Sequence, residues 1–302
     1  MLHHLVGWIR SESSKPRTRG HWARWLGRNW ARVSYGYRIE PTWLEVNRIG
    51  IAVADLPSAF AGFRIAQLSD FHASRHVTSA YLEEAIALAH AEQPDIVVLT
   101  GDFVHVGYRY VETVAHCLGS LQAPYGVFAV LGNHDFSVRN ALGIRRYRHL
   151  SHAVAKALQA RGIQVLQNES CTLAKEGQSL HVVGVDDLWS RGCDLERAFA
   201  GLSPAIPKIV LAHNPRTVER LEQQRCDLML SGHTHGGQVK LDGIGTPTLS
   251  RKARKLAAGL YSDGSTQLYV NKGVGFGFRF RYGVRPEIAI FTLSPGAPSA
   301  QP

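Results

Sequence analysis

The sequence predicts an α/β fold in which mixed sheets are covered by helices. In the first half of the chain, short apolar runs alternate with segments of helical periodicity, which is typical of strand–helix–strand units. In the second half, short apolar runs follow one another more closely, which favours direct pairing of strands. Polar motifs spread from residue 70 to residue 235 follow five of these runs, and they must converge on one site. We therefore expect one catalytic domain over 38–293.

The elements follow in chain order. A strand over 62–69 precedes a helix that Thr78 or Ser79 caps, and Pro94 separates this helix from a strand over 95–100. A second unit occupies 108–131, and a helix carrying Leu150, Val154 and Leu158 on one face stops at Gly162. Further strands are predicted over 163–167, 171–174, 180–185, 209–212, 227–230, 268–271 and 287–293, with helices over 194–200 and 215–224.

Five motifs stand at the carboxyl ends of predicted strands, where open α/β sheets bind ligands. They are Asp70-Phe71-His72, Gly101-Asp102, Gly132-Asn133-His134-Asp135, His213 and Gly232-His233-Thr234-His235. Carboxylate, amide oxygen and neutral imidazole suit Mn, Fe, Zn or Co, and no Cys accompanies them. A carboxylate such as that of Asp102 can bridge two ions roughly 3.5–4 Å apart, the arrangement of two-metal phosphoesterases. His134 is predicted to protonate the leaving oxygen, with the Asp135 carboxylate fixing its tautomer.

In order and spacing, these motifs resemble the calcineurin-like metallophosphoesterase superfamily. The resemblance implies a four-layer αββα sandwich with two mixed sheets and a metal site at the strand carboxyl edge. It also implies two divalent metal ions. Their ligands would be Asp70, His72 and His235 for the first, Asn133, His213 and His233 for the second, and Asp102 as the bridge.

The string from Gly232 to Gln238 and the tail around 269–288 resemble one branch in particular. That branch holds bacterial phosphodiesterases and membrane-associated UDP-2,3-diacylglucosamine pyrophosphatases. His105 stands where family members often carry an Asp, and it is expected to replace that residue in the shell around Asp102.

Several polar residues have two interpretations. Arg279, Arg281 and Arg285 lie in a Gly- and aromatic-rich stretch, where they would bind phosphate or belong to a solvated hairpin. Asp186 and Asp187 follow an apolar run, and a turn is favoured over a supporting role at the metals.

The net charge of +10 is concentrated in an N-terminal segment, residues 1–37, that precedes the domain. Trp22, Trp25, Leu26, Trp30 and Val33 would share one helical face, beside arginines at 24, 28 and 32. Such a helix typically lies in a membrane interface and is drawn there by anionic lipid. The alternatives are a strap packed on the domain and a basic arm for nucleic acid, and we expect no specific nucleic-acid partner.

No run of 18 apolar residues occurs, so no membrane-spanning helix is expected. The N-terminus lacks a secretory apolar core, and the four Cys show no metal-binding spacing. Reduced thiols and a cytoplasmic location, peripheral at the inner face of the cell membrane, are therefore expected. Residues 294–302 are predicted to form a disordered tail.

The sequence thus predicts a dinuclear hydrolase of a phosphodiester or pyrophosphate bond in a phosphate-containing small molecule or lipid. The finer expectation is a membrane-associated substrate of the UDP-2,3-diacylglucosamine type. The alternatives are a soluble phosphodiesterase of nucleotides or nucleic acid, and a metal-bound scaffold without turnover.

Overall fold

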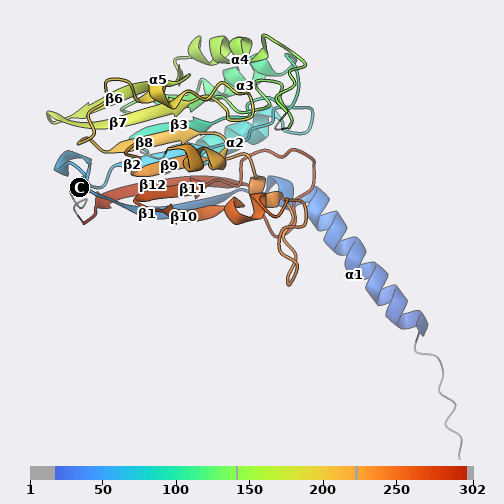
Figure 1. The fold of residues 1–302 in the computed structure, drawn as a ribbon. Helices are drawn as coiled ribbons and strands as arrows, with labels where there is room; N and C mark the ends of the chain where they lie inside the picture. The colour runs from blue at the N-terminus through green and yellow to red at the C-terminus, as the bar shows by residue number, and fades with distance from the viewer. Residues whose placement is uncertain (1–17, 141, 222–223, 298–302) are drawn as a thin grey trace, which may run out of the picture.

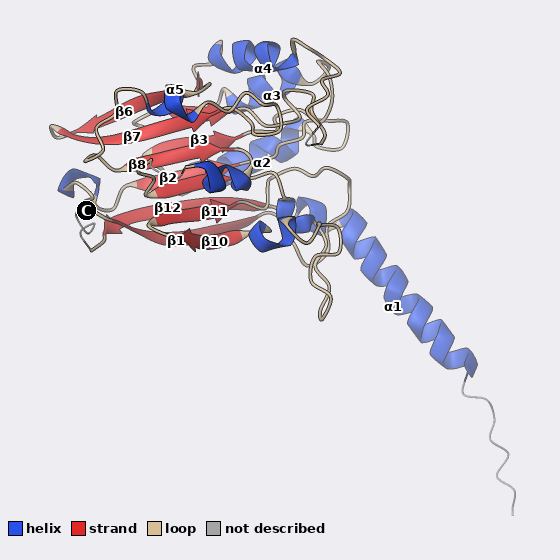
Figure 2. Cartoon of the chain, viewed as in Figure 1, coloured by secondary structure: helices blue, strands red, loops and turns tan. Residues whose placement is uncertain are grey.

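Two six-stranded sheets stack face to face and carry helices on their outer sides (Figures 1 and 2). The structure is a computed structural model that describes residues 18–140, 142–221 and 224–297. The expectations for residues 1–17 and 298–302 lie outside this described part. The prediction that the disordered tail starts at residue 294 is wrong, because Ser294 and Pro295 pair with Ala52 and Val53 and end the last strand. The predicted αββα order of layers is confirmed.

The first sheet carries three of the five motifs. Its strand order is β1 (Glu45–Val53), β12 (Glu287–Pro295), β2 (Arg64–Leu68), β3 (Ile96–Thr100), β4 (Val127–Val130) and β5 (Gln164–Val165). Strands β2 to β5 are parallel, whereas β12 runs antiparallel to β2. The outer helices are α2 (Ser79–Ala91), α3 (Val111–Leu118) and α4 (Leu150–Gln159). Thr78 caps α2, because its side chain accepts a hydrogen bond from the Tyr81 backbone N–H.

The second sheet carries the other two motifs. Its order is β10 (Gly259–Asp263), β11 (Thr266–Val270), β9 (Leu228–Ser231), β8 (Lys208–Ala212), β7 (Gln178–Val185) and β6 (Glu169–Lys175). Its outer layer is thin, with α5 (Leu195–Phe199) and the 3₁₀ helix η3 (Pro215–Arg220). The helix predicted over 215–224 is thus a shorter 3₁₀ helix. Brief 3₁₀ turns complete the fold at Glu40–Thr42, Ser58–Phe60, His235–Gly237 and Ala253–Leu256.

Three apolar clusters fill the three spaces between the four layers. In β3, Val97 and Leu99 face the helices, while Ile96 and Val98 face the other sheet. A third cluster lies between the second sheet and its outer helices. Central strands that are buried on both faces are mostly apolar, so they appear in the sequence as nearly continuous apolar runs.

Helix α1 (Thr18–Arg38) projects away from the sandwich (Figure 1). Its last turns are fixed at Gly36, which is buried and whose carbonyl accepts the Arg281 backbone N–H at 2.9 Å. Leu26, Trp30 and Val33 are exposed, Trp30 by 75%. These three side chains therefore do not form a strap on the domain. No helix in the described part of the chain is long and apolar enough to cross a membrane.

Candidate metal centre

The five motifs meet at one end of the sandwich, because β2, β3, β4, β8 and β9 all end there. All seven predicted ligands are brought together, and six of them are buried: Asp70, His72, Asp102, Asn133, His213 and His235. The seventh, His233, is half-buried and lines the same pocket as His72, Asp102 and Asn133.

The first group of donors is Asp70, His72 and His235. Nε2 of His72 lies 2.9 Å from Nε2 of His235, and His235 Nε2 lies 3.3 Å from Oδ1 of Asp70. Ligands at about 2.1 Å from one ion are roughly 3 Å from each other when they subtend a right angle. This group therefore fits around one divalent ion.

The second group is formed by Asn133, His213 and His233. The amide oxygen of Asn133 lies 3.2 Å from His213 Nε2 and 2.8 Å from His233 Nδ1. Asp102 lies between the two groups, since its Oδ2 is 3.5 Å from His72 Nε2 and 3.3 Å from His213 Nε2. Its other oxygen accepts the backbone N–H of His134 at 2.8 Å. The donor set and its spacing thus fit two ions with Asp102 as the shared ligand.

Burial and neighbouring charges together set the protonation of these donors. Burial would lower the pKa of His213, but the Asp102 carboxylate raises it to about 10. Burial lowers the pKa of His233 to about 3 and the pKa values of His72 and His235 well below the usual range. These imidazoles are neutral near pH 7, so each has a nitrogen lone pair for a metal. Burial also raises the pKa of Asp70 to about 6, although the nearby His213 opposes this rise. Burial by itself would raise the pKa of Asp102, but the nearby His213 and His134 hold this pKa well below the usual range.

The motif backbones adopt conformations that non-glycine residues seldom take. Asp70, His72, Asp102, His233 and His235 have φ between 46° and 75°, in the left-handed region. Such strain persists where the surrounding structure enforces it, and it concentrates at functional sites. In these motifs the left-handed backbone conformation directs the ligand side chains toward the same pocket.

Two glycines allow the carboxylates to pack directly on the backbone. A Cβ on Gly132 would lie 2.2 Å from Oδ1 of Asp102, and one on Gly232 would lie 2.2 Å from Oδ2 of Asp70. Any other residue would displace these carboxylates. The glycines in the motifs therefore position ligands as well as making turns.

His134 lies at the pocket but is held differently from what was expected. Its Nδ1 is 2.8 Å from the carbonyl oxygen of His105, an acceptor that leaves Nε2 free for the substrate. Asp135 instead accepts backbone N–H groups from Gly132, at 2.8 Å, and from Phe103, at 2.9 Å. The prediction that Asp135 fixes the His134 tautomer is therefore wrong, because that carboxylate is buried behind the loops that carry Asp102 and Asn133.

The role expected of His105 also changes. Its backbone carbonyl supports His134, while its ring lies 5.4 Å from that of His72 and 5.5 Å from that of His134. The support expected for the Asp102 loop comes from Asp135, whose Oδ1 accepts the N–H groups of Phe103 and Val104.

Arg281 has a structural role that neither of its two predicted interpretations describes. It is fully buried, and its Nη2 donates to the carbonyl oxygens of Lys272 at 2.8 Å and Gly275 at 2.6 Å. The Gly275 N–H donates in turn to the Asp70 carbonyl. Arg281 thus holds the loop behind Asp70, which neither phosphate binding nor a solvated hairpin describes.

The other ambiguous residues are also structural. Arg285 stacks over the ring of Trp43 at 4.0 Å, and Arg279 lies over that of Tyr37 at 5.3 Å. The favoured turn interpretation fits Asp187, which accepts the Ser190 backbone N–H at 2.7 Å. Trp189, in the same turn, packs edge-on against His233 with centroids 4.4 Å apart.

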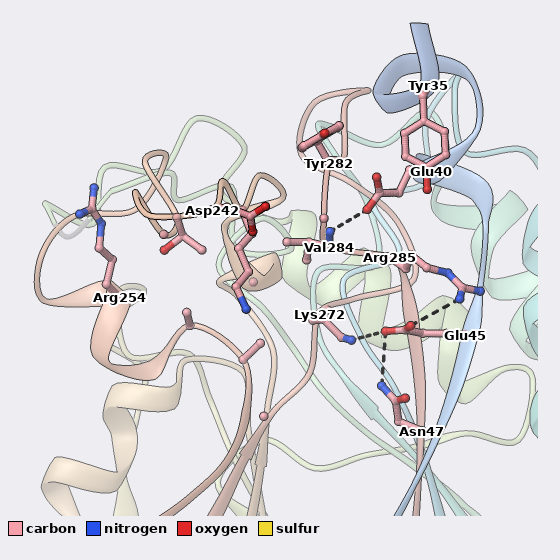
Figure 3. Close-up of a pocket in the computed structure, with 18 of the residues that line it drawn as sticks. Tyr35, Glu40, Glu45, Asn47, Asp242, Arg254, Lys272, Tyr282, Val284 and Arg285 are labelled. Carbon is pink, nitrogen blue, oxygen red and sulfur yellow. Dashed lines mark hydrogen bonds and ion pairs between the residues drawn. The ribbon is translucent and has the colours of Figure 1, made fainter. Parts of the chain in front are cut away.

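Two pockets adjoin the metal-binding loops. One, of about 460 Å³, is lined by five of the seven metal donors, all except Asp70 and His213, together with His134, Arg139 and Phe278. The other, of about 1170 Å³, lies beyond Gly236 at the root of α1. Figure 3 shows Lys272, Arg285 and Asn47 directed at Glu45 on one wall of it, with Asp242 and Arg254 on the facing wall.

Comparison with known proteins agrees with this geometry. Residues 63–237 match the family model described as calcineurin-like phosphoesterase. Phosphodiesterase YaeI of Escherichia coli is 33% identical, over 86% of this chain and 92% of that protein. UDP-2,3-diacylglucosamine pyrophosphatase LpxG of Chlamydia trachomatis is 31% identical, over 83% of this chain and 90% of that protein. An uncharacterized metallophosphoesterase of Bacillus subtilis, YkuE, is 33% identical over 86% of this chain and 89% of that protein.

Proposed function

The chain belongs to the calcineurin-like phosphoesterase family, and on that basis we propose that it hydrolyses a phosphodiester or pyrophosphate bond in a membrane-associated, lipid-linked substrate. As a metallophosphoesterase it is a hydrolase. The observation that carries the proposal is the position of Asp102 Oδ2, 3.5 Å and 3.3 Å from one imidazole of each donor group.

Two divalent ions held by these donors would bind a phosphoryl oxygen and supply the nucleophilic hydroxide. The residues of the chain have separate tasks. Asn133 contributes a neutral oxygen, so the pocket gains a donor without adding negative charge against an anionic substrate. His134, with Nδ1 on the His105 carbonyl, presents Nε2 from which a proton can pass to the leaving oxygen. Arg139 at the same pocket offers a cation to a second phosphate.

The lipid part of the proposal is supported by α1 and by the relative LpxG. Leu26, Trp30 and Val33 are exposed on a helix that also carries Arg28 and Arg32. A helix of this composition suits an anionic membrane surface, here the inner face of the cell membrane. A substrate of the UDP-2,3-diacylglucosamine type would then meet the enzyme at the bilayer.

The test offers the Mn²⁺-loaded protein UDP-2,3-diacylglucosamine and an aryl phosphodiester side by side, with Asp102→Asn as the inactive control. Release of UMP and the lipid phosphate, at a kcat/KM well above that for the aryl ester, is the expected result. Turnover of the aryl ester alone would favour a phosphodiesterase of soluble substrates. No turnover of either, with two ions bound, would favour the scaffold.

A further inference from the structure

The exposed large apolar side chains gather at one end of the molecule. In the described part of the chain they lie on α1, between α1 and β1, or beside the carboxyl ends of the strands. The loops at those strand ends contribute Val106, Tyr108, Leu142, Ile144, Ile244 and Phe278. The remaining one, Leu260, is the second residue of β10, which starts at the same end because Gly259 pairs with Val270.

The opposite end differs. Its turns, among the residues that the structure describes, carry no exposed large apolar side chain. Single exposed apolar residues are ordinary, but a concentration of them on one surface marks an interaction site. Ile144 is 71% exposed and Ile244 is 62% exposed, and they stand on loops of different sheets. The asymmetry therefore spans the whole end of the sandwich.

The same loops are basic. Residues 136–149 contain four Arg and no acidic residue, and residues 240–256 contain five basic residues and one acidic residue. Lys240, Arg146 and Lys252 form no ion pair within the described residues. Apolar loop tips flanked by unpaired cations match the interface of an anionic bilayer, where the tips enter the acyl boundary and the cations contact phosphates. A nucleic acid would use the cations but would leave the isoleucine tips in water.

Three further features of the protein lie at this end. Helix α1 leaves the domain here and exposes its own apolar side chains. The metal pocket lies here, with Arg139 and Phe278 in its lining. The larger pocket of Figure 3 lies between the end of α1 and the 240–256 loop, with Lys240 and Arg254 in its lining. A bilayer on this end would present head groups to both pockets.

We propose that the loop end of the sandwich is itself a membrane-contacting surface for anionic phospholipid, separate from the helix α1. The loops around Ile144 and Ile244 enter the bilayer interface, and the metal pocket faces the head groups. The proposed function requires only that residues 1–37 reach a membrane. This inference fixes the orientation of the catalytic domain on that membrane, and it stands whichever head group is hydrolysed.

The first test uses the full-length double variant Ile144→Glu/Ile244→Glu and vesicles of phosphatidylcholine with phosphatidylglycerol. The variant loses two apolar side chains that would insert into the bilayer, and it gains two carboxylates that the anionic surface repels. We therefore expect its vesicle binding to be weaker by about ten-fold or more. The variant Gln122→Glu/Gln159→Glu adds the same charge at exposed positions of the opposite end and should bind like the wild type. Turnover of a soluble aryl phosphodiester should be unchanged in both. Equal vesicle binding by the two variants would overturn the proposal.

A second measurement reads orientation directly and does not depend on those variants. An environment-sensitive dye on Ile144→Cys or Ile244→Cys should shift to the blue when these vesicles are added, whereas the same dye on Gln159→Cys should not. A domain that only hangs from α1 would leave all three probes unshifted, which refutes the surface. Loss of duplex DNA binding with unchanged vesicle binding in the double variant would assign the end to nucleic acid instead. The vesicles contain no substrate, so failure here leaves the proposed hydrolysis untouched.

Discussion

Substituting Gly132 by Ala tests whether the metal pair depends on the close packing of Asp102 against backbone. The substitution leaves every ligand in the chain. The new Cβ would lie 2.2 Å from Asp102 Oδ1 and 2.4 Å from the Asp102 backbone nitrogen. An ordinary Cβ contact begins near 3.4 Å. The gap must therefore open by about 1 Å, whereas a metal site tolerates displacements of only about 0.2 Å.

Because the crowded atoms are backbone and a buried carboxylate, no flexible side-chain end can yield. We expect the shared ligand to leave its position, so that bound metal falls below two ions per chain. A misplacement of about 1 Å costs on the order of 100-fold in rate, which sets the expected loss in kcat. Overpacking should also lower the free energy of unfolding by about 1–3 kcal/mol.

The assay measures metal content by elemental analysis, kcat on an aryl phosphodiester and the midpoint of thermal unfolding. Gly50→Ala in β1 is the matched control, since its Cβ would meet no atom within 4 Å. It should bind two ions and turn over normally. Two tightly held ions and wild-type kcat in Gly132→Ala would refute the placement of Asp102 between the donor groups.

Three further predictions follow from the same contacts. His134→Ala should keep both metals and lose about 10²–10⁴-fold in kcat, with a smaller loss for an activated aryl leaving group; equal losses for good and poor leaving groups would exclude the proton-donor role. Because burial raises the pKa of Asp70 to about 6, and a protonated carboxylate binds a metal poorly, metal affinity measured by equilibrium dialysis should fall more steeply with decreasing pH once the pH drops below 6. A pH dependence that does not steepen there would contradict the assignment of Asp70 as a ligand. Removing residues 1–30 leaves the Gly36 contact in place, so the truncated protein should keep its activity on a soluble aryl ester. Its sedimentation with vesicles should become weaker but should not be abolished. Unfolding of the truncated protein, seen by circular dichroism, would instead show that these residues stabilise the domain.

The central strands were predictable because their environment is uniform. Strand β3 is buried at all five positions and β8 likewise, so each is apolar except at one terminal residue, Thr100 in β3 and Lys208 in β8. The edge strands β1 and β10 were not predicted. Most positions of β1 are half-buried or exposed and no position of β10 is buried, so their sequences mix polar and apolar residues without a clear period. These two strands form by pairing with their neighbours, β12 and β11, and their own sequences do not indicate that pairing.

The sequence alone was enough to predict the donors of the proposed metal centre. A ligand must stand directly after a strand that ends at the site, so strand and donor are adjacent in the chain, and Asp70, Asp102 and His213 could each be found locally. Only the tertiary structure decided which groups support them. The acceptor for His134 is a carbonyl 29 residues earlier, and Arg281 binds carbonyl groups of the loop behind Asp70, a role that its Gly- and aromatic-rich segment does not indicate. Backbone acceptors are the same at every residue, so no sequence pattern marks them. Likewise, the gathering of apolar loop tips at one end becomes visible only when parallel strands bring loops from distant positions side by side.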